Sequence, residues 1–173
     1  MVMDGRGENM TVVVTGTGGC GTASAAQHFG IGHERVFTPY QPPAGFDIPD
    51  SSWLAAPYIP QIRLPVVHVV RNPTDVVGAL LGGGIFDEKR RAEAGPYRRY
   101  IEHWCPQVFV PAEPIRQVCQ FYLLWNRMIG DNPVKIEDLT TIRINRRPHP
   151  GRVTISWDDI PELETIAIEY GYL

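Results

Sequence analysis

The stretch TVVVTGTGGCGTAS, from Thr11 to Ser24, decides the fold class of this 173-residue chain. The β-branched run from Val12 to Val14 predicts a short strand that is buried on both faces. A loop rich in glycine follows, and the segment ASAAQHF then predicts a helix. A strand, a glycine-rich loop and a helix in this order favour phosphate binding, because the loop amides and the positive end of the helix converge on an anion.

The loop is not a typical ATP-binding loop, which has the pattern GxxxxGK[ST]. Thr22 replaces the lysine of that pattern, and Ala23 replaces the residue whose hydroxyl binds magnesium. The GxGxxG pattern of dinucleotide loops is present at Gly16, Gly18 and Gly21, but the next predicted strand, RVFTP, ends without the acidic residue that holds a ribose. A tight strand-to-helix turn without any ligand is the remaining alternative.

The rest of the chain alternates predicted strands and helices. The predicted strands are RVFTP, LPVVHVV and PVKIEDL, and the predicted helices are SSWLAAPY, NPTDVVGALL, EPIRQVCQFYLLWNRMIG and PELETIAIEYGYL. The charged segment DEKRRAEAGPYRRY is expected to face solvent. This alternation predicts an α/β fold, a three-layer P-loop fold with a mostly parallel central sheet flanked by helices. Residues 11–173 are expected to form this single domain after a flexible lead-in at residues 1–10.

Composition excludes several classes of protein. The net charge of -3 argues against broad electrostatic attraction to nucleic acid. The three cysteines lack the spacing of a metal site and are odd in number, which indicates a reduced, cytoplasmic compartment rather than a disulfide framework. No apolar run approaches the roughly 20 residues that a membrane helix needs. We therefore expect no metal, no nucleic acid and no membrane partner.

A second candidate anion-binding group is Arg71, which follows the apolar run VVHVV. In a parallel sheet the ligand lies beyond the carboxyl ends of the strands, where Arg71 and the glycine loop would both emerge. A guanidinium at this edge can make a forked contact to a phosphate. Asp75 comes four residues later, and the alternative is an ion pair that only ties the strand to the following helix.

Together these segments resemble the P-loop sulfotransferases that use 3′-phosphoadenosine 5′-phosphosulfate, in particular their bacterial members. The loop motif of that family, GxPRSGTT, is matched by GTGGCGTA, and its RNPxDVxxS motif is matched by RNPTDVVGA. A GHE triplet at Gly32, His33 and Glu34, the segment LLWNRMIGDNPVKIEDL and the terminal YGY are further similarities. The resemblance extends from Val12 to Tyr172.

The resemblance implies that the loop holds the 5′-phosphosulfate and that Arg71 binds the 3′-phosphate. The loop residues assigned in this way to the cofactor are Gly16, Thr17, Gly18, Gly19, Cys20, Gly21, Thr22 and Ala23. Ala79 stands where the family has a serine that also binds the 3′-phosphate, and Gly19 stands where it has a lysine or arginine that neutralises the leaving phosphate. Loss of one such donor costs about 2.7–4 kcal/mol at the transition state, so either another cation substitutes or the protein is slow or inactive. The candidate substitutes are Arg35, Lys89, Arg90, Arg91, Arg146, Arg147 and Arg152.

His33 and Glu34 are the leading candidates for the base that takes a proton from the acceptor. A histidine is suited to this role because its ordinary pKa lies near neutral pH. The alternative is that the GHE triplet is a surface turn in which Glu34 pairs with Arg35. His68 lies inside the apolar run VVHVV and is expected to be a hydrogen-bonded core residue rather than a base.

The resemblance therefore implies an enzyme that transfers a sulfuryl group from 3′-phosphoadenosine 5′-phosphosulfate to the hydroxyl or amine of a small-molecule or glycan acceptor. A different class is a catalytically weakened nucleotide-binding or interaction module on the same scaffold, which the glycine and alanine at positions 19 and 79 favour. A P-loop kinase-like enzyme is a third alternative, which the missing lysine and magnesium-binding hydroxyl disfavour.

Overall fold

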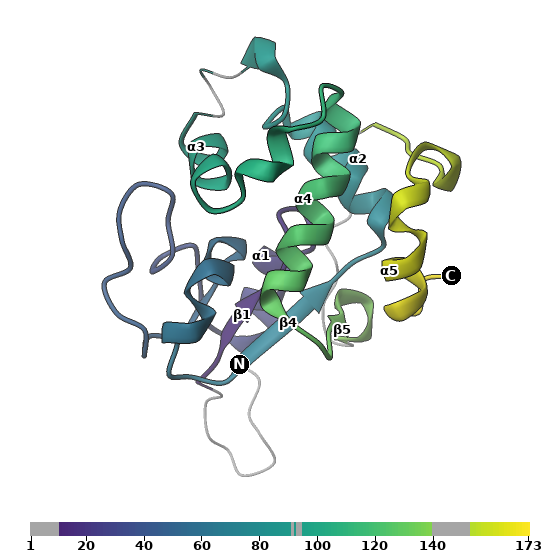
Figure 1. Ribbon diagram of the computed structural model, residues 1–173. Coiled ribbons are helices and arrows are strands. Elements are labelled where there is room, and N and C mark those ends of the chain that lie inside the picture. The colour runs from purple at the N-terminus through teal and green to yellow at the C-terminus, as the bar shows by residue number, and fades with distance from the viewer. Residues whose placement is uncertain (1–10, 91, 93–94, 140–152) are drawn as a thin grey trace.

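The chain folds around a parallel β-sheet, seen in a computed structural model that describes residues 11–90, 92, 95–139 and 153–173 (Figure 1). The expected lead-in at residues 1–10 and the basic loop at residues 143–152 lie outside the described residues. The strands are β1 (Val13–Thr15), β2 (Gly32–His33), β3 (Asp50–Ser51), β4 (Val66–Val70) and β5 (Val134–Lys135). They pair in the order β2-β3-β1-β4-β5, and every pair is parallel.

Helices flank this sheet, which confirms the predicted three-layer α/β fold. The α-helices are α1 (Thr22–Phe29), α2 (Pro73–Gly83), α3 (Gly95–Trp104), α4 (Pro114–Ile129) and α5 (Glu164–Glu169). The 3-10 helices are η1 (Trp53–Gln61), η2 (Glu88–Arg90), η3 (Pro106–Phe109), η4 (Ile136–Asp138), η5 (Trp157–Asp159) and η6 (Pro161–Leu163). Helix α1 packs against β1, β2 and β3, while α4 packs against α2 and crosses in front of the sheet in Figure 1. None of the described helices is long and apolar enough to cross a membrane.

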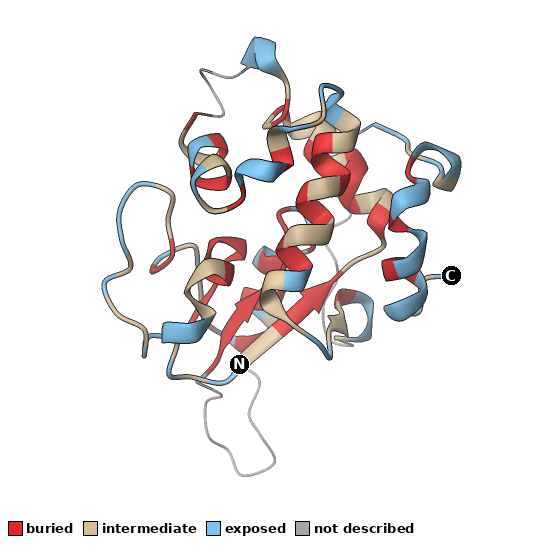
Figure 2. Cartoon of the chain, in the orientation of Figure 1, coloured by how far each residue is buried: buried red, intermediate tan, exposed pale blue. Residues whose placement is uncertain are grey.

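The long helix α4 has the apolar face that its sequence predicts. Val118, Cys119, Tyr122 and Trp125 are buried, whereas Ile115 at the start of the helix is only half-buried (Figure 2). These residues recur at helical spacing, so they form one stripe that faces the core. The strands β1 and β4 supply the other side of that core, with Val13, Val14 and Val69 fully buried.

The predicted second strand, RVFTP, is wrong. The strand at this edge of the sheet is β2, which lies earlier in the chain, and β3 was not predicted at all. The reason is the buried carboxylate of Asp50, which accepts hydrogen bonds from the amides of Arg35, Val36 and Phe37 at 3.3, 3.0 and 3.2 Å. Those amides are bonded to a side chain and are therefore not available to a sheet ladder.

The expectation that DEKRRAEAGPYRRY faces solvent is wrong at Arg98, in helix α3. Arg98 is 6% exposed and lies in ion pairs with Glu88 at 2.9 Å and Glu102 at 3.1 Å. Its guanidinium also stacks over the ring of Phe109, 4.6 Å from the ring centroid. These partners stabilise the charge of a buried arginine. The charge of Arg98 therefore did not indicate that its face of α3 is buried.

The expectation that His68 is a hydrogen-bonded core residue is confirmed. Its Nδ1 lies 3.0 Å from the carbonyl oxygen of Gly130, and its Nε2 lies 2.9 Å from Oδ1 of Asn126. Burial lowers the pKa of His68 below its ordinary value of 6.5, and this effect outweighs the two contacts, which raise it.

The free energy of unfolding is expected to fall as the pH is lowered through about 6.5, because the unfolded chain then binds a proton that the buried His68 ring resists. Urea unfolding at pH 7.5 and at pH 5.5 measures the effect. The variant His68→Gln lacks the titrating ring, so its stability should change less between the two pH values. An equal change in both proteins would show that other groups cause the pH dependence.

Candidate functional site

The glycine loop leaves β1 at the carboxyl edge of the sheet and turns sharply into α1. A Cβ atom at Gly16 would lie only 2.2 Å from the carbonyl oxygen of Val69 and 2.5 Å from Sγ of Cys20, so no other residue fits there. The amide of Cys20 donates to the carbonyl oxygen of Thr17 at 3.1 Å, which closes the turn. The loop backbone therefore lies tightly against the end of the neighbouring strand β4.

The conformation of the loop suits an anion. Gly19 and Gly21 have φ angles of 82° and 104°, in the left-handed region that favours glycine. Gly21 is the N-cap of α1 but contributes no side chain, so the first amides of the helix lack an intrahelical or side-chain cap. The hydroxyl of Thr17 is fully buried and has no hydrogen-bond partner among the described residues. A bound anion would satisfy such donors.

Arg71 follows β4 at the same edge, beside the loop. The other residues of its motif are explained by the start of α2: Asn72 accepts hydrogen bonds from the amide and hydroxyl of Thr74 at 3.1 and 2.9 Å, and Pro73 is the first helical residue. Arg71 forms an ion pair with Asp75 at 3.2 Å, which is the contact that the alternative interpretation of this arginine predicted. Its Nε is nevertheless buried without a hydrogen-bond partner among the described residues.

The positive charge of Arg71 also acts on the glycine loop. Burial raises the pKa of the Cys20 thiol to about 12, while the Arg71 guanidinium acts in the opposite direction. This thiol stays protonated at neutral pH, so Cys20 serves as a packing residue and not as a nucleophile. The guanidinium is therefore near the loop that contains Cys20, and its positive charge favours an anion there.

Two later motifs of the sequence meet at this edge as well. A Cβ atom at Gly21 would lie 2.8 Å from Cγ1 of Ile136, which precedes the acidic residues of the EDL segment. The hydroxyl of Tyr172, in the terminal YGY, lies 2.9 Å from Oε2 of Glu137 and 3.3 Å from the carbonyl oxygen of Val70. These motifs therefore support the loop and the strand end that carries Arg71.

Gly19 and Ala79, the two positions that depart from the family motifs, face each other. A Cβ atom at Gly19 would lie 3.6 Å from Cβ of Ala79. The left-handed backbone at Gly19 also disfavours a lysine or arginine at that position. Both positions therefore border the same space, and neither residue offers a side-chain hydrogen-bond donor to it.

His33 and Glu34 lie on the other side of the loop, at the end of β2. The Nε2 of His33 lies 3.4 Å from the hydroxyl of Thr22 and 3.8 Å from Oε1 of Glu34. Glu34 has a φ angle of 50°, which is uncommon for a residue with a side chain and is often found at functional sites. The His33 side chain is 38% exposed and that of Glu34 is 20% exposed, so Glu34 is the more enclosed of the two.

Tyr97, in α3, holds the Glu34 carboxylate. Its hydroxyl donates to Oε2 of Glu34 at 3.2 Å, and its ring stacks on Trp53 with centroids 5.9 Å apart. Burial, and then the charge of Glu34, raise the pKa of Tyr97 to about 12. Tyr97 is therefore a neutral donor at neutral pH and keeps the carboxylate in one orientation. Nothing in the local sequence of α3 predicted this role.

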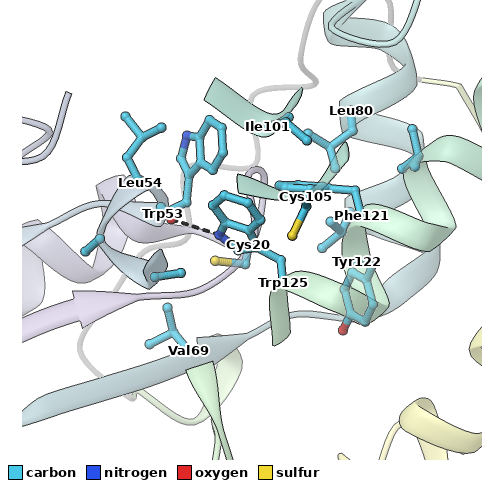
Figure 3. Packing of buried hydrophobic residues seen from close by; sticks show 14 of the residues in the cluster. Cys20, Trp53, Leu54, Val69, Leu80, Ile101, Cys105, Phe121, Tyr122 and Trp125 are labelled. Carbon is cyan, nitrogen blue, oxygen red and sulfur yellow. Dashed lines mark hydrogen bonds between the residues drawn. The ribbon is translucent and has the colours of Figure 1, made fainter. Parts of the chain in front are cut away.

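A cavity of about 200 Å³ connects the loop with Glu34. Its lining comes from the loop, η1 and the helices α2, α3 and α4, and four of its apolar members, Trp53, Leu80, Ile101 and Phe121, are labelled in Figure 3. The complete lining is Gly18, Gly19, Glu34, Trp53, Ala79, Leu80, Gly83, Ile85, Tyr97, Ile101 and Phe121. It contains one carboxylate and one phenol, the indole of Trp53 adds one N–H group, and the other side chains are apolar.

The described residues provide no obvious substitute for the missing loop cation. No lysine or arginine is among the described residues that line the cavity. Arg35 and Lys89 are exposed, and Arg90 lies against the end of α2, with Nη1 3.4 Å from the carbonyl oxygen of Gly82. Arg91, Arg146, Arg147 and Arg152 lie outside the described residues.

In the part of the chain that the structure describes, no group of acidic, histidine and cysteine residues could hold a metal ion.

Comparisons of this chain with protein-family models, with curated proteins and with solved structures found no match.

Proposed function

We propose that this protein binds 3′-phosphoadenosine 5′-phosphosulfate at the glycine loop and Arg71, and transfers its sulfuryl group to an acceptor in the adjoining cavity. The observation that supports this proposal best is the arrangement at one sheet edge. A phosphate loop without lysine lines a cavity that a held carboxylate also lines, and a partly unsatisfied arginine lies beside that loop.

The residues at this edge suit a nucleotide with phosphate groups at two positions. The uncapped start of α1 and the buried hydroxyl of Thr17 would hold the 5′-phosphosulfate. Arg71 would hold the 3′-phosphate through Nε and the guanidinium N–H groups that Asp75 does not occupy. Mg-ATP fits less well, because Thr22 and Ala23 replace the lysine and the magnesium-binding hydroxyl.

Glu34 is the residue that we assign as the general base, since it lines the cavity and His33 does not. Tyr97 orients the carboxylate, and His33 lies on its far side, between Glu34 and the hydroxyl of Thr22. When bound, the nucleotide supplies an activated sulfuryl group. The protein then has to position the acceptor oxygen in line with sulfur and accept its proton.

The test is calorimetric titration of the intact protein with 3′-phosphoadenosine 5′-phosphate in the absence of metal. Arg71→Ala should weaken binding by about 10- to 100-fold, because a hydrogen-bonded charge contributes about 1.5–3 kcal/mol. The control is Arg63→Ala, which removes an exposed arginine away from this edge and should leave binding unchanged. Absence of binding to the intact protein, or equal binding by Arg71→Ala, would reject the assignment.

A second candidate function is a nucleotide-binding module that has lost catalysis. The residues at positions 19 and 79 favour it, because neither glycine nor alanine has a side-chain donor for the leaving phosphate. Such a module would bind 3′-phosphoadenosine 5′-phosphate but would transfer no labelled sulfate. Detectable transfer to any acceptor would exclude this alternative.

A further inference from the structure

We infer that the acceptor is a neutral phenol with a single ring, bound in the cavity with its hydroxyl directed at Glu34. This inference rests on the proposed function and narrows the chemical class of the acceptor. The sequence left two classes of acceptor as alternatives, small molecules and glycans. It is drawn from the lining, the size and the polar end of the cavity.

The lining favours a flat apolar molecule. Side chains from four separate elements, Trp53, Leu80, Ile101 and Phe121, form its walls, and Trp53 meets Phe121 edge to face at 5.7 Å (Figure 3). An aromatic ring gains contact with such walls, and aromatic pairs prefer stacked or edge-to-face arrangements. A sugar ring would bring several hydroxyls into a space where the polar side-chain groups of the described lining residues are the Glu34 carboxylate, the Tyr97 hydroxyl and the indole N–H of Trp53. Its remaining hydroxyls would lose their hydrogen bonds to water without replacement.

The volume of the cavity favours a single ring. An apolar cavity of about 150 Å³ is known to hold benzene. The present cavity, at about 200 Å³, has room for a ring with a hydroxyl and one small substituent. A fused polycyclic alcohol exceeds this volume, so part of it would lie outside the apolar walls.

The polar end of the cavity selects a hydroxyl that can lose a proton. Oε2 of Glu34 accepts from Tyr97, and Oε1 lies 3.8 Å from Nε2 of His33, too far for a hydrogen bond, so Oε1 can accept from an acceptor hydroxyl. Gly18 and Gly19 bound the cavity on the side of the loop, where the sulfuryl group would enter. In the transfer, the phenol oxygen forms a bond to sulfur and its proton passes to Glu34. The bond from sulfur to the bridging oxygen breaks, and 3′-phosphoadenosine 5′-phosphate leaves with that electron pair. An acceptor with its own carboxylate would be repelled by Glu34.

Gly83 offers a substitution that tests this inference without disturbing the core. It lines the cavity at the end of α2, and a Cβ atom added there meets no other atom within 4 Å. Because Gly83 lines the cavity and the space around that Cβ atom is open, leucine at this position is expected to take up part of the space available to the ring. Because glycine is a poor helix former, both Gly83→Ala and Gly83→Leu are expected to be at least as stable as the natural protein.

The experiment is titration of the protein with 4-methylphenol. Binding is measured by calorimetry and by the shift of the indole N–H signal of Trp53 in NMR spectra. We expect binding that Gly83→Leu weakens by about tenfold or more and that Gly83→Ala changes little, because the larger side chain overlaps the ring. N-acetylglucosamine should neither bind nor compete. All three proteins should bind 3′-phosphoadenosine 5′-phosphate equally, and urea unfolding should confirm that both variants are folded.

Separate results would overturn the two proposals. No binding of 4-methylphenol, equal binding by Gly83→Leu, or tighter binding of N-acetylglucosamine would overturn the phenol assignment, even if the nucleotide binds. Binding of 4-methylphenol without binding of the nucleotide would overturn the proposed function and leave the assignment of the cavity to a phenol intact.

Discussion

Replacing Glu34 with glutamine is expected to lower the rate of sulfuryl transfer by about 100- to 10,000-fold while nucleotide binding stays unchanged. The amide of glutamine has nearly the same shape as the carboxylate and still accepts a hydrogen bond from Tyr97, which now donates to Oε2 at 3.2 Å. The variant therefore keeps the cavity and loses only the group that takes the proton. The measurement is kcat for transfer of labelled sulfate from the nucleotide to 4-methylphenol.

Two matched variants separate the base from the residues that position it. Tyr97→Phe keeps the carboxylate and removes its hydrogen bond, so the loss in kcat should be smaller than for Glu34→Gln. His33→Gln should also have a smaller effect, because His33 does not line the cavity and lies 3.8 Å from Oε1 of Glu34. If His33→Gln instead abolished transfer while Glu34→Gln remained active, the assignments of the two residues would have to be exchanged.

The sequence predicted those parts of the site that lie within one continuous segment. The loop, its glycines and the following helix are local features, since the φ angles of Gly19 and Gly21 and the close approach at Gly16 are requirements of the backbone itself. The strand β4 and the start of α2 are predictable for the same reason, because Asn72 and Pro73 are typical of a helix start. The parallel order of the strands then places Arg71 beside the loop.

The cavity could not be predicted, because its walls come from segments that have no common local pattern. Tyr97 lies in a charged segment that was expected to face solvent, and only the packing of α3 against Trp53 brings it to Glu34. Ile101 and Phe121 look like ordinary core residues in the sequence. A residue that reaches the site only through tertiary packing is not marked by any regular spacing in the sequence. A loop whose backbone forms the candidate site is marked by the spacing of its glycines.

Asp50 is the clearest case of a residue whose role depends on distant parts of the chain. It is fully buried in β3, where its backbone lies between Val13 of β1 and Gly32 of β2. Its carboxylate accepts from three successive amides that directly follow Glu34. It thereby replaces a sheet ladder at this edge and fixes the path of the chain as it leaves the proposed base.

Asp50→Ala is therefore expected to lower the free energy of unfolding by about 3 kcal/mol or more, since three amide donors lose their acceptor and each unsatisfied buried group costs about 1–3 kcal/mol. Asp50→Asn should cost less, because its side-chain oxygen can still accept from part of this group. Urea unfolding of the two variants measures the difference. A loss below about 1 kcal/mol for Asp50→Ala would mean that water satisfies these amides. In that case Asp50 would not be what holds the segment behind Glu34 in place.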